Sequence, residues 1–568
     1  MPGQSWATVG VAVISALVYL ATRFYASRKE LRNLQRENLP MPDFDPVFGH
    51  LRVLKEASSS LPPDTIMHNV MWKLAQQNFP GGIFYLHLWP FSRTLLVVAD
   101  AYTASQVEDL GLGKGDNIVK PIETITGGPS LLTMEGAEWK HWRRLFSIGF
   151  SAGYLIGLAP AIADEVAVFR DLLIKKCRNA PDGRSEVFPM EEMTVRMTFD
   201  VIGRVVLDTH FQYQLHENSL ASALRSSVEW TSWRGQLNPV TRYLSIRSIV
   251  HWLNSRTMDR YIGHEIDKRF AERIEGIRAA KLSGSEDPNK QSKSIVSLLI
   301  DDVVRESGNG DIERAKQTVK KAMSSQLRVF LFAGHDTSSA ALTYCYYLLS
   351  THPTALDLLL TEHNTIFGDH PGDALVQIHS DPHKLNQLPY TTALLKETLR
   401  LFPPAGSMRL GRPGTFLFDE TGRRFPTENC SVWTLSLAIH HDARYWVEPE
   451  KFLPERWLVG PDDPLYPGRT KGAWRPFEHG PRNCIGQSLA LLELKIVLVL
   501  TAREINVIPA YEEWDAFHSK RGSCRKDQAV KTVNGIRAYQ AEKGAAHPAD
   551  GFPVRVKLRP QCGGDHRY

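Results

Sequence analysis

The sequence predicts one large, mainly α-helical domain with small β-sheets, behind one N-terminal transmembrane helix. Three observations predict this fold class: an uncharged apolar run at the N-terminus, long segments with apolar residues every three to four positions, and only short strand-like stretches. Of the 568 residues, 43% are hydrophobic and 23% are charged, which is the composition of an ordinary globular protein. The net charge of +5 is too small for this length to indicate a nucleic-acid partner.

The N-terminal segment is expected to be an uncleaved signal anchor. Residues 1–22 carry no charged side chain, and the roughly twenty residues from Ser5 to Tyr25 are enough to cross the hydrocarbon core of a membrane. The basic residues that follow, as far as Arg36, predict that the rest of the chain stays in the cytosol. The alternative is a cleaved signal peptide, but no small-x-small cleavage site follows the apolar run. Since no other stretch looks long and apolar enough to span, we expect a single pass.

Four segments are predicted along the chain. They are an anchor over 5–25, a basic flank and proline hinge over 26–50, one body over 51–560 and a polar tail over 561–568. Within the body, the polar stretches Lys281–Lys293 and Asp369–Lys384 are expected to be long loops, because they are rich in polar, proline and glycine residues.

Apolar spacing predicts the elements of the body. Residues three and four apart share a face of a helix, whereas residues two apart share a face of a strand. Helices are predicted over Ala161–Lys175, Met190–Leu207, Lys320–Ser350 and Leu388–Phe402. Strands are predicted over Ile83–Leu88, Thr94–Val98, Thr415–Phe418 and Ser431–Leu435.

One of the six cysteines stands out. The six are scattered with no C-x-x-C pair, which indicates neither a zinc site nor a disulfide framework. Cys484 ends a loop rich in glycine and proline and precedes the apolar helical run Leu491–Leu500. A helix N-terminus stabilises a thiolate, and Gly480 and Gly486 would let a flat cofactor approach the backbone. Arg482 could reach a carboxylate on that cofactor. The alternative for such a cysteine is an ordinary packed thiol.

The residues around Cys484 settle that alternative by resemblance. The string Phe477-x-x-Gly480-x-Arg482-x-Cys484-x-Gly486 resembles the haem-binding signature of the cytochromes P450 at every position. The resemblance implies the fold of that family, a triangular prism of helices around a haem. It also implies that Cys484 is the thiolate ligand of the iron of haem b, with Phe477, Gly480, Arg482 and Gly486 shaping the cofactor site.

The run Leu331–Ser339 lies inside a predicted long helix. A glycine in a helix interior costs about 1 kcal/mol relative to alanine, so Gly334 calls for a reason. The run resembles the oxygen-activation motif of the same family, which implies that Ala333 and Gly334 border the cofactor and that Asp336 and Thr337 deliver protons. The alternative is an ordinary buried helix in which Asp336 and Thr337 are paired with the backbone.

Two further patterns follow in the family's order. Glu397 and Arg400 alone would be an exposed pair of little value. With Arg456 they resemble the Glu-Arg-Arg network that supports the cysteine loop, although Trp457 stands where the family more often has phenylalanine. Trp139 and Arg143 resemble the W-x-x-x-R helix that contacts a haem propionate, and Arg409 resembles a second propionate-binding arginine.

The resemblance implies a monooxygenase that inserts one oxygen atom from O2 into a hydrophobic substrate by hydroxylation or epoxidation. Electrons would come from NADPH through a separate NADPH–cytochrome P450 reductase, because the chain shows no glycine-rich dinucleotide loop after a strand; cytochrome b5 stays open as a second donor. The expected location is the endoplasmic reticulum membrane, with the catalytic domain in the cytosol. The pattern is similar to fungal microsomal members of secondary metabolism. Ile118–Thr133, Phe211–Leu253 and Ala405–Met408 fall where the family lines its pocket, although the tryptophans Trp230, Trp233 and Trp252 are more often core or membrane-contacting.

Two other functions stay open. A haem-thiolate isomerase or dehydratase would need no electrons, but such proteins usually lose the acid–threonine pair that this chain keeps. A non-enzymatic haem-binding membrane protein would show no NADPH-dependent turnover.

Overall fold

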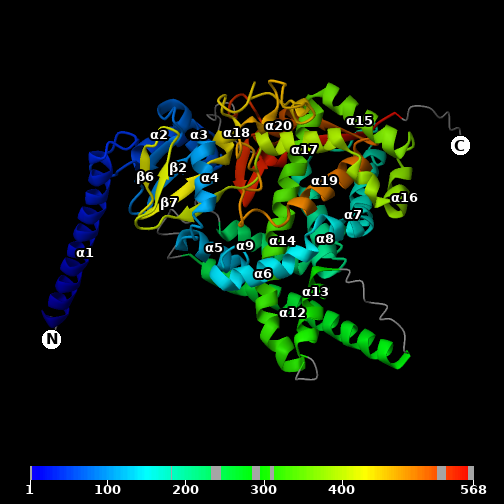
Figure 1. Ribbon diagram of the computed structural model, residues 1–568, viewed down its shortest axis with the longest axis horizontal. Helices are drawn as coiled ribbons and strands as arrows, with labels where there is room; N and C mark the ends of the chain where they lie inside the picture. The colour runs from blue at the N-terminus through cyan, green and yellow to red at the C-terminus, as the bar shows by residue number, and fades with distance from the viewer. Residues whose placement is uncertain are drawn as a thin grey trace. The chain divides into compact units, whose positions relative to one another are not determined.

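The computed structural model describes residues 3–180, 182–231, 245–283, 294–307, 312–520 and 532–560, and these form two compact units (Figure 1). The first unit comprises residues 1–60, 70–115 and 407–435, and the second comprises 61–69, 116–406 and 436–568. Each unit is described separately below. Trp233, Cys524, Cys562 and the predicted tail over 561–568 lie outside the described residues.

The first unit is built on a four-stranded sheet with the strand order β1-β2-β7-β4. The pairs β1–β2 and β4–β7 are antiparallel, whereas β2 and β7 are parallel. The buried strand β2 places apolar side chains on both faces, which is why it reads as a continuous apolar run. The elements are α1 (Gly3–Arg36), α2 (Leu51–Ser59), most of α3 (Met67–Asn78), β1 (Ile83–Leu86), β2 (Thr94–Val98), α4 (Ala101–Asp109), β4 (Ser407–Leu410), β5 (Phe416–Phe418), β6 (Arg424–Pro426) and β7 (Cys430–Thr434).

The end of helix α1 packs onto this unit. The Ser27 hydroxyl lies 2.7 Å from Nε2 of His87, and the Arg28 guanidinium donates to the carbonyl oxygens of Pro46 and Val47. Leu31 is fully buried. The predicted basic flank is therefore helical as far as Arg36, and its inner face is part of the folded unit. Residues Val11, Ile14, Leu17, Val18 and Leu20, earlier in the same helix, are exposed, as expected of a segment that lies in a membrane.

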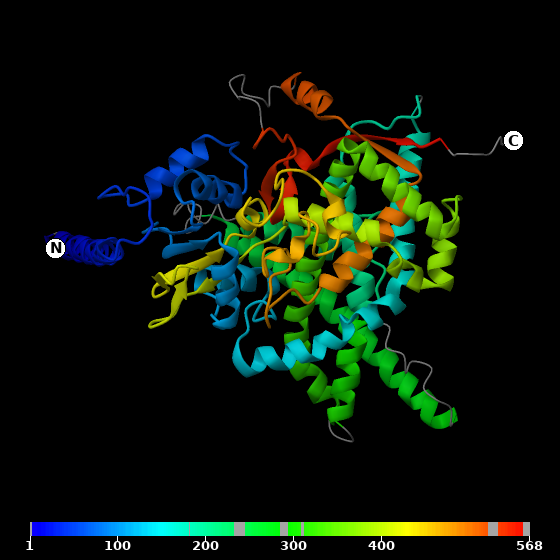
Figure 2. The same cartoon turned by 45° about the horizontal axis from the view of Figure 1, so that its top comes forward.

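The second unit holds most of the helices, with a three-stranded sheet in the order β3-β11-β8 and the hairpin β9–β10. Helices α8 and α14 pack side by side, as do α7 and α19. Figure 2 shows the C-terminal strands, in red, along the upper side of the helices. The helices are α5 (Asp116–Thr126), α6 (Gly136–Gly149), α7 (Ala152–Arg178), α8 (Met190–Leu207), α9 (Ser219–Thr231), α12 (Arg247–Ser283), α13 (Ile295–Ser307), α14 (Ile312–Thr351), α15 (Pro353–Phe367), α16 (Asp373–Ser380), α17 (Pro389–Leu401), α18 (Ser436–His440), α19 (Gln487–Thr501) and α20 (Tyr511–Lys520). The strands are β3 (Phe188–Pro189), β8 (Ile505–Pro509), β9 (Gln540–Lys543), β10 (Ala545–Pro548) and β11 (Pro553–Leu558), and the 3-10 turns are η1 (Pro382–Asn386), η2 (Pro454–Trp457), η3 (Pro467–Arg469) and η4 (Ala549–Gly551).

The predicted fold class, mainly α with small sheets, is confirmed. Helix α8 and strand β2 have the predicted bounds, and α14 and α7 extend beyond theirs by several residues. The prediction of a long loop over Asp369–Lys384 is wrong, because α16 and the start of η1 occupy it. Ala374 and Ile378, four apart on α16, are fully buried, so one apolar face was enough to form a short helix. Most of Lys281–Lys293 lies outside the described residues.

Two described helices, not one, are long and apolar enough to cross a membrane: 10–36 and α7. The expectation that no second stretch passes this test is wrong. The most apolar stretch of α7 has a mean hydropathy of 1.5. Of this stretch, 39% is buried inside the protein, against 6% of the N-terminal stretch. Ile162, Val166, Phe169 and Leu173 on α7 are fully buried in the protein core, so its apolar character is explained by packing within the second unit.

Candidate functional site

The loop before α19 presents Cys484 in a defined backbone frame. The Cys484 N–H donates to the Phe477 carbonyl oxygen at 2.9 Å, and the Asn483 N–H donates to Gly480 at 3.1 Å. Gly480 has a φ of +71°, in the left-handed region that favours glycine. The sequence therefore closes a tight turn whose last residue is the cysteine, three positions before the first residue of α19.

Cys484 differs from the other described cysteines in its surroundings. It is exposed, whereas Cys177, Cys345 and Cys430 are buried. Neighbouring protein atoms still desolvate the Cys484 thiol enough to raise its pKa, although the N–H groups of Gly486 and Gln487 and the charge of Arg143 oppose that rise. Burial raises the pKa of Cys345 to about 12, so that thiol is inert.

Helix α6 contacts the cysteine loop through a tryptophan and an arginine. The Arg143 guanidinium donates to the Asn483 carbonyl oxygen at 2.8 Å and to its Oδ1 at 2.7 Å. The Arg482 guanidinium lies 4.1 Å from the centroid of the Trp139 ring and donates to the Met134 carbonyl at 2.8 Å. Three positively charged or aromatic groups predicted from two distant motifs, Trp139, Arg143 and Arg482, thus meet beside the cysteine loop. Asn483, which receives both bonds from Arg143, carried no signal in the sequence.

Helix α14 carries the other predicted group of residues. The Thr337 hydroxyl donates to the Ala333 carbonyl oxygen at 2.7 Å, one turn earlier. A Cβ on Gly334 would lie 2.8 Å from two side-chain carbons of Ile202 on α8. Close approach of these two helices therefore requires glycine at this position. This close packing explains why a glycine stands in the middle of the helix.

Asp336 is buried and is held by the C-terminal hairpin. Its Oδ2 accepts from the Ala545 N–H at 2.5 Å, and its Oδ1 lies 2.9 Å from Nε2 of His547. Burial raises the pKa of Asp336, but His547 outweighs that effect and the net shift is downward. Asp336 and Thr337 thus both have backbone partners, as the alternative of an ordinary buried helix anticipated, but Asp336 is also paired with the His547 side chain from β10.

A second buried group lies next to these residues. Glu493 on α19 is 3% exposed. Burial raises its pKa to about 8, against a hydrogen bond with Ser338 that lowers it. A carboxyl group that is mostly protonated at neutral pH therefore connects α19, the helix that follows Cys484, with α14. Only its burial, which the sequence does not reveal, marks this glutamate as unusual.

Glu397, Arg400 and Arg456 form one fully buried network. Arg400 donates to both carboxylate oxygens of Glu397, at 3.0 and 2.8 Å, and Nε of Arg456 donates to Oε1 at 3.0 Å. Burial raises the pKa of Glu397, but the two arginines more than offset it, so the pKa is lowered. A buried charge is tolerated only when it is paired and hydrogen-bonded in this way.

Two residues to which the sequence assigned no role, Trp457 and His440, complete this network. The Trp457 indole N–H donates to Oε2 of Glu397 at 3.0 Å, which phenylalanine could not do. His440 lies between Arg400 and the cysteine loop: its Nδ1 is 2.9 Å from the Arg400 carbonyl oxygen, and its Nε2 accepts from the Arg475 N–H at 2.9 Å. Burial holds the pKa of His440 well below its ordinary value. The neutral ring therefore ties the network to the segment that leads into Cys484.

The predicted residue Arg409 lies on β4 in the first unit, whereas the residues described above belong to the second. Of the predicted pocket segments, Thr126 and Leu131 in Ile118–Thr133 are buried, and the Leu131 N–H donates to Gln326 on α14 at 2.8 Å. Trp230 and Trp252 are exposed, so they are not core residues.

The residues around Cys484 fit a haem. Among the described residues, no group of three or more His, Cys, Asp and Glu side chains could hold a metal ion. A site that offers one protein sulfur would leave an iron short of ligands, and a porphyrin would supply four of them. Arg143, Arg482 and the Trp139 ring provide the donors and apolar surface that the carboxylates and edge of such a group require.

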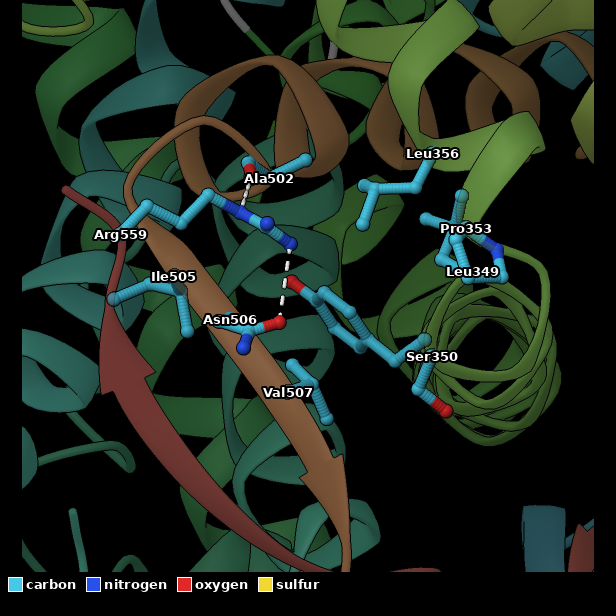
Figure 3. Close-up of a pocket in the computed structure, with 10 residues that line it drawn as sticks. Leu349, Ser350, Pro353, Leu356, Ala502, Ile505, Asn506, Val507 and Arg559 are labelled. Atoms are coloured by element: carbon cyan, nitrogen blue, oxygen red, sulfur yellow. Dashed lines mark hydrogen bonds between the residues drawn. The ribbon is translucent and has the colours of Figure 1, made fainter. Parts of the chain in front are cut away.

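A separate pocket of about 190 Å³ lies at the end of α14 (Figure 3). Its lining residues are Tyr346, Leu349, Ser350, Pro353, Leu356, Ala502, Ile505, Asn506, Val507 and Arg559. Arg559 donates to the Ala502 carbonyl oxygen at 2.9 Å and to Asn506 at 3.3 Å. None of the predicted site residues lines this pocket, so it is distinct from the cysteine loop.

Comparison with known proteins gives consistent matches. The family model described as Cytochrome P450 matches residues 39–530. Cytochrome P450 monooxygenase polC of Polytolypa hystricis is 37% identical over 548 residues, which cover 96% of this chain and 94% of that protein. Cytochrome P450 monooxygenase acrF of Aspergillus aculeatus is 32% identical over 495 residues, covering 84% and 94%.

Solved structures agree on the fold. The crystal structure of the cytochrome P450DA heme domain has a TM-score of 0.67 at 21% identity, and the match covers 92% of this chain and 98% of that one.

Proposed function

The chain belongs to the cytochrome P450 family, and from that premise we propose that it oxidises a hydrophobic small molecule in a tailoring step of fungal secondary metabolism. Members of this family are monooxygenases that use haem b and take electrons from NADPH through a reductase. The reaction we propose is hydroxylation or epoxidation. Similarity to monooxygenases of two fungi over most of their length supports this assignment.

The observation that carries the proposal is the exposed Cys484 at the N-terminus of α19. We assign Cys484 as the axial thiolate ligand of the haem iron. Desolvation by the surrounding protein raises the pKa of Cys484, and the N–H groups of Gly486 and Gln487 together with Arg143 oppose that rise by favouring the charged sulfur. The Glu397 network with His440 holds the preceding segment in place. Gly480 allows the loop to turn, and the Phe477 carbonyl oxygen accepts a hydrogen bond from the Cys484 N–H. These backbone features hold the cysteine in position.

The remaining residues take supporting roles. Trp139, Arg143 and Arg482 would bind the haem propionates, with Arg409 as a further propionate ligand. When bound, the haem supplies activation of dioxygen and transfer of one oxygen atom to the substrate. Ala333, one turn before Thr337, would give α14 a surface with little side-chain bulk, and Gly334 lets this part of α14 pack closely against α8. Asp336 and Thr337 hold and pass protons next to that surface, while the buried residues of α14 and α8 exclude water.

Membrane attachment and partners follow from the rest of the chain. The family implies a redox partner and a hydrophobic substrate. We propose NADPH–cytochrome P450 reductase as the electron donor, with cytochrome b5 as an additional one. Lys140 and Arg144 on α6 would be basic contacts for an acidic redox partner. The N-terminal apolar helix fits membrane anchoring, and we propose a single pass through the endoplasmic reticulum membrane with the body in the cytosol.

The experiment that tests the proposal is the carbon-monoxide difference spectrum of reduced membranes that express the full chain. We expect the absorption band that gives cytochromes P450 their name. Cys484→Ala should abolish the band, whereas Cys177→Ala, at a buried cysteine of α7, should keep it. A normal band in Cys484→Ala would refute the assigned ligand.

Turnover separates the remaining functions. Thr337→Ala should keep the band and release a larger share of the NADPH electrons as hydrogen peroxide, because proton delivery is impaired. An undiminished product yield in Thr337→Ala would refute that role. Product formation without NADPH would favour the isomerase or dehydratase, and a band without any turnover would favour a non-enzymatic haem protein.

A further inference from the structure

The Asp336 carboxylate is enclosed by one hairpin from the far end of the chain. Strands β9 and β10 are antiparallel and are joined by Gly544. Ala545 and His547 of β10 occupy both carboxylate oxygens, at 2.5 and 2.9 Å. His547 is 1% exposed and Asp336 is 7% exposed. The orientation of this acid is therefore determined by residues outside its own helix.

The hairpin is shaped to fit the carboxylate. Gly544 has a φ of +103°, and a Cβ there would lie 2.7 Å from Oδ2 of Asp336 and 2.8 Å from Val228 on α9. Neither the backbone conformation nor the space admits a side chain. The turn thus brings the Ala545 N–H close to the carboxylate, which is a precise contact for two segments so distant in sequence.

His547 lies among charged groups from several elements. Its Nδ1 is 3.7 Å from Oε1 of Glu191 on α8, and Lys543 of β9 pairs with the other Glu191 oxygen at 2.8 Å. The charge of His335 on α14 also lowers the pKa of Asp336, and the charge of Arg225 on α9 lowers the pKa of His335. Burial lowers the pKa of His547, but Glu191 and Asp336 outweigh it and the net shift is upward. The two carboxylates therefore favour the imidazolium form of His547 over the neutral ring.

We propose that His547 is a positioning residue for Asp336, which it holds as an ionised carboxylate turned toward the C-terminal hairpin. The proposal rests on the proposed function, in which Asp336 and Thr337 serve proton delivery. Thr337 meanwhile points its hydroxyl at Ala333 on its own helix, so the two members of the motif are held by different elements. The hairpin, and not α14 alone, then decides when Asp336 can exchange a proton.

Two variants separate the hydrogen bond from the charge. His547→Gln keeps an N–H donor near the Nε2 position without the charge, and His547→Ala removes both. The matched control is His379→Gln. His379 makes a similar pair with Asp164 at 2.8 Å, but both side chains are about half exposed, so little stability is expected from it.

The first readout is thermal unfolding of the full-length chain, as purified in detergent, as a function of pH. A raised folded pKa stabilises the protein below the unfolded value of about 6.5 and loses that stabilisation as pH rises through the folded value. The advantage of the natural chain over His547→Gln should therefore be greatest near pH 6 and shrink at higher pH. His379→Gln should show no such trend. A pH-independent difference between the natural chain and His547→Gln would overturn the ion pair.

The second readout is the share of oxidised NADPH that appears as hydrogen peroxide with the reductase and no added substrate. Misplacing a proton-transfer group costs up to about 100-fold, so we expect the ratio of hydrogen peroxide to water formed to rise about tenfold in His547→Ala, less in His547→Gln and not at all in His379→Gln. An altered pH profile with an unchanged peroxide share would reduce His547 to a structural role and overturn the positioning role. If the carbon-monoxide band or NADPH turnover is absent in the natural chain, the proposed function fails, whereas the unfolding arm still decides whether the ion pair exists.

Discussion

At the scale of single residues, Trp457 shows how one atom can support a buried charge. Its indole N–H is one of the donors on Glu397, together with Arg400, Arg456 and the Leu453 N–H. A hydrogen bond to a charged group contributes about 1.5–3 kcal/mol. We expect Trp457→Phe to destabilise the protein by that amount and to leave the carbon-monoxide band intact before unfolding begins, since Cys484 is not touched.

The matched control for this substitution is Trp474→Phe. Trp474 donates its indole N–H to the neutral Lys396 carbonyl oxygen at 3.2 Å, a bond worth about 0.5–1.5 kcal/mol. The midpoint of thermal unfolding should therefore fall further for Trp457→Phe than for Trp474→Phe. Equal losses in the two variants would mean that the contact with Glu397 adds nothing beyond ring packing.

At the scale of elements, the contact between α14 and α8 depends on Gly334. Alanine would improve helix propensity by about 1 kcal/mol, but its Cβ would lie 2.8 Å from the Ile202 side chain. Overpacking of this kind costs about 1–3 kcal/mol. We therefore expect Gly334→Ala to be destabilising or neutral, and never to show the gain that an exposed helix position would show.

A double-mutant cycle identifies the cause. Ile202→Ala removes the clashing atoms but leaves a cavity, and the double variant should be more stable than the sum of the two single changes predicts. The measurement is the unfolding midpoint of the four proteins. Simple additivity would show that Gly334 is not kept for its contact with Ile202.

Periodicity predicted the elements that have one clear face, and it failed where tertiary contacts decide. Helix α8 and strand β2 were predicted with their observed bounds. Helix α16 was predicted as a loop, because its two buried residues are too few for a periodic signal. The strands β9 and β10 were not predicted at all: their sequence mixes charged, small and proline residues, and they become a hairpin through Gly544 and the contact with Asp336.

The same distinction holds for the site. Cys484, Arg143 and the pair Glu397–Arg400 could be predicted because their motifs constrain residue type at a short spacing. Arg456, 59 residues from Glu397, could be added only by resemblance to the family's order of motifs. His440, Asn483 and His547 could not be predicted, because each acts through contacts with residues far along the chain. A sequence pattern specifies groups that must share a loop or a helix face. It does not specify a partner that the fold brings in from elsewhere.

At the scale of the whole molecule, two separate apolar surfaces are available to a membrane. One is the exposed part of α1. The other is the stripe Ile246, Ile249, Trp252 and Leu253 near the start of α12, whose side chains are 52–61% exposed and lie three to four residues apart. Such an apolar helix face binds a membrane interface in proportion to the area that it buries. We expect the stripe to be a second membrane contact.

A chain that begins at Ala26 tests this expectation, because it removes the predicted span and keeps Ser27, Arg28 and Leu31, which pack on the first unit. We expect a fraction of this chain to sediment with phosphatidylcholine vesicles. This lipid carries no net charge, so such binding cannot be purely electrostatic. Half-exposed side chains contribute about 1 kcal/mol each when buried. Ile249→Ser with Trp252→Ser should then weaken binding about 30-fold.

The control for these two substitutions is Leu358→Ser with Val376→Ser, at exposed apolar residues of α15 and α16. It removes a comparable apolar area away from the stripe and should leave vesicle binding unchanged. Complete release of the chain that begins at Ala26, with the stripe intact, would show that α1 alone attaches the protein. Equal loss of binding in both pairs would show that attachment depends on general hydrophobicity and not on the stripe, because only a local contact can distinguish two surfaces of similar composition.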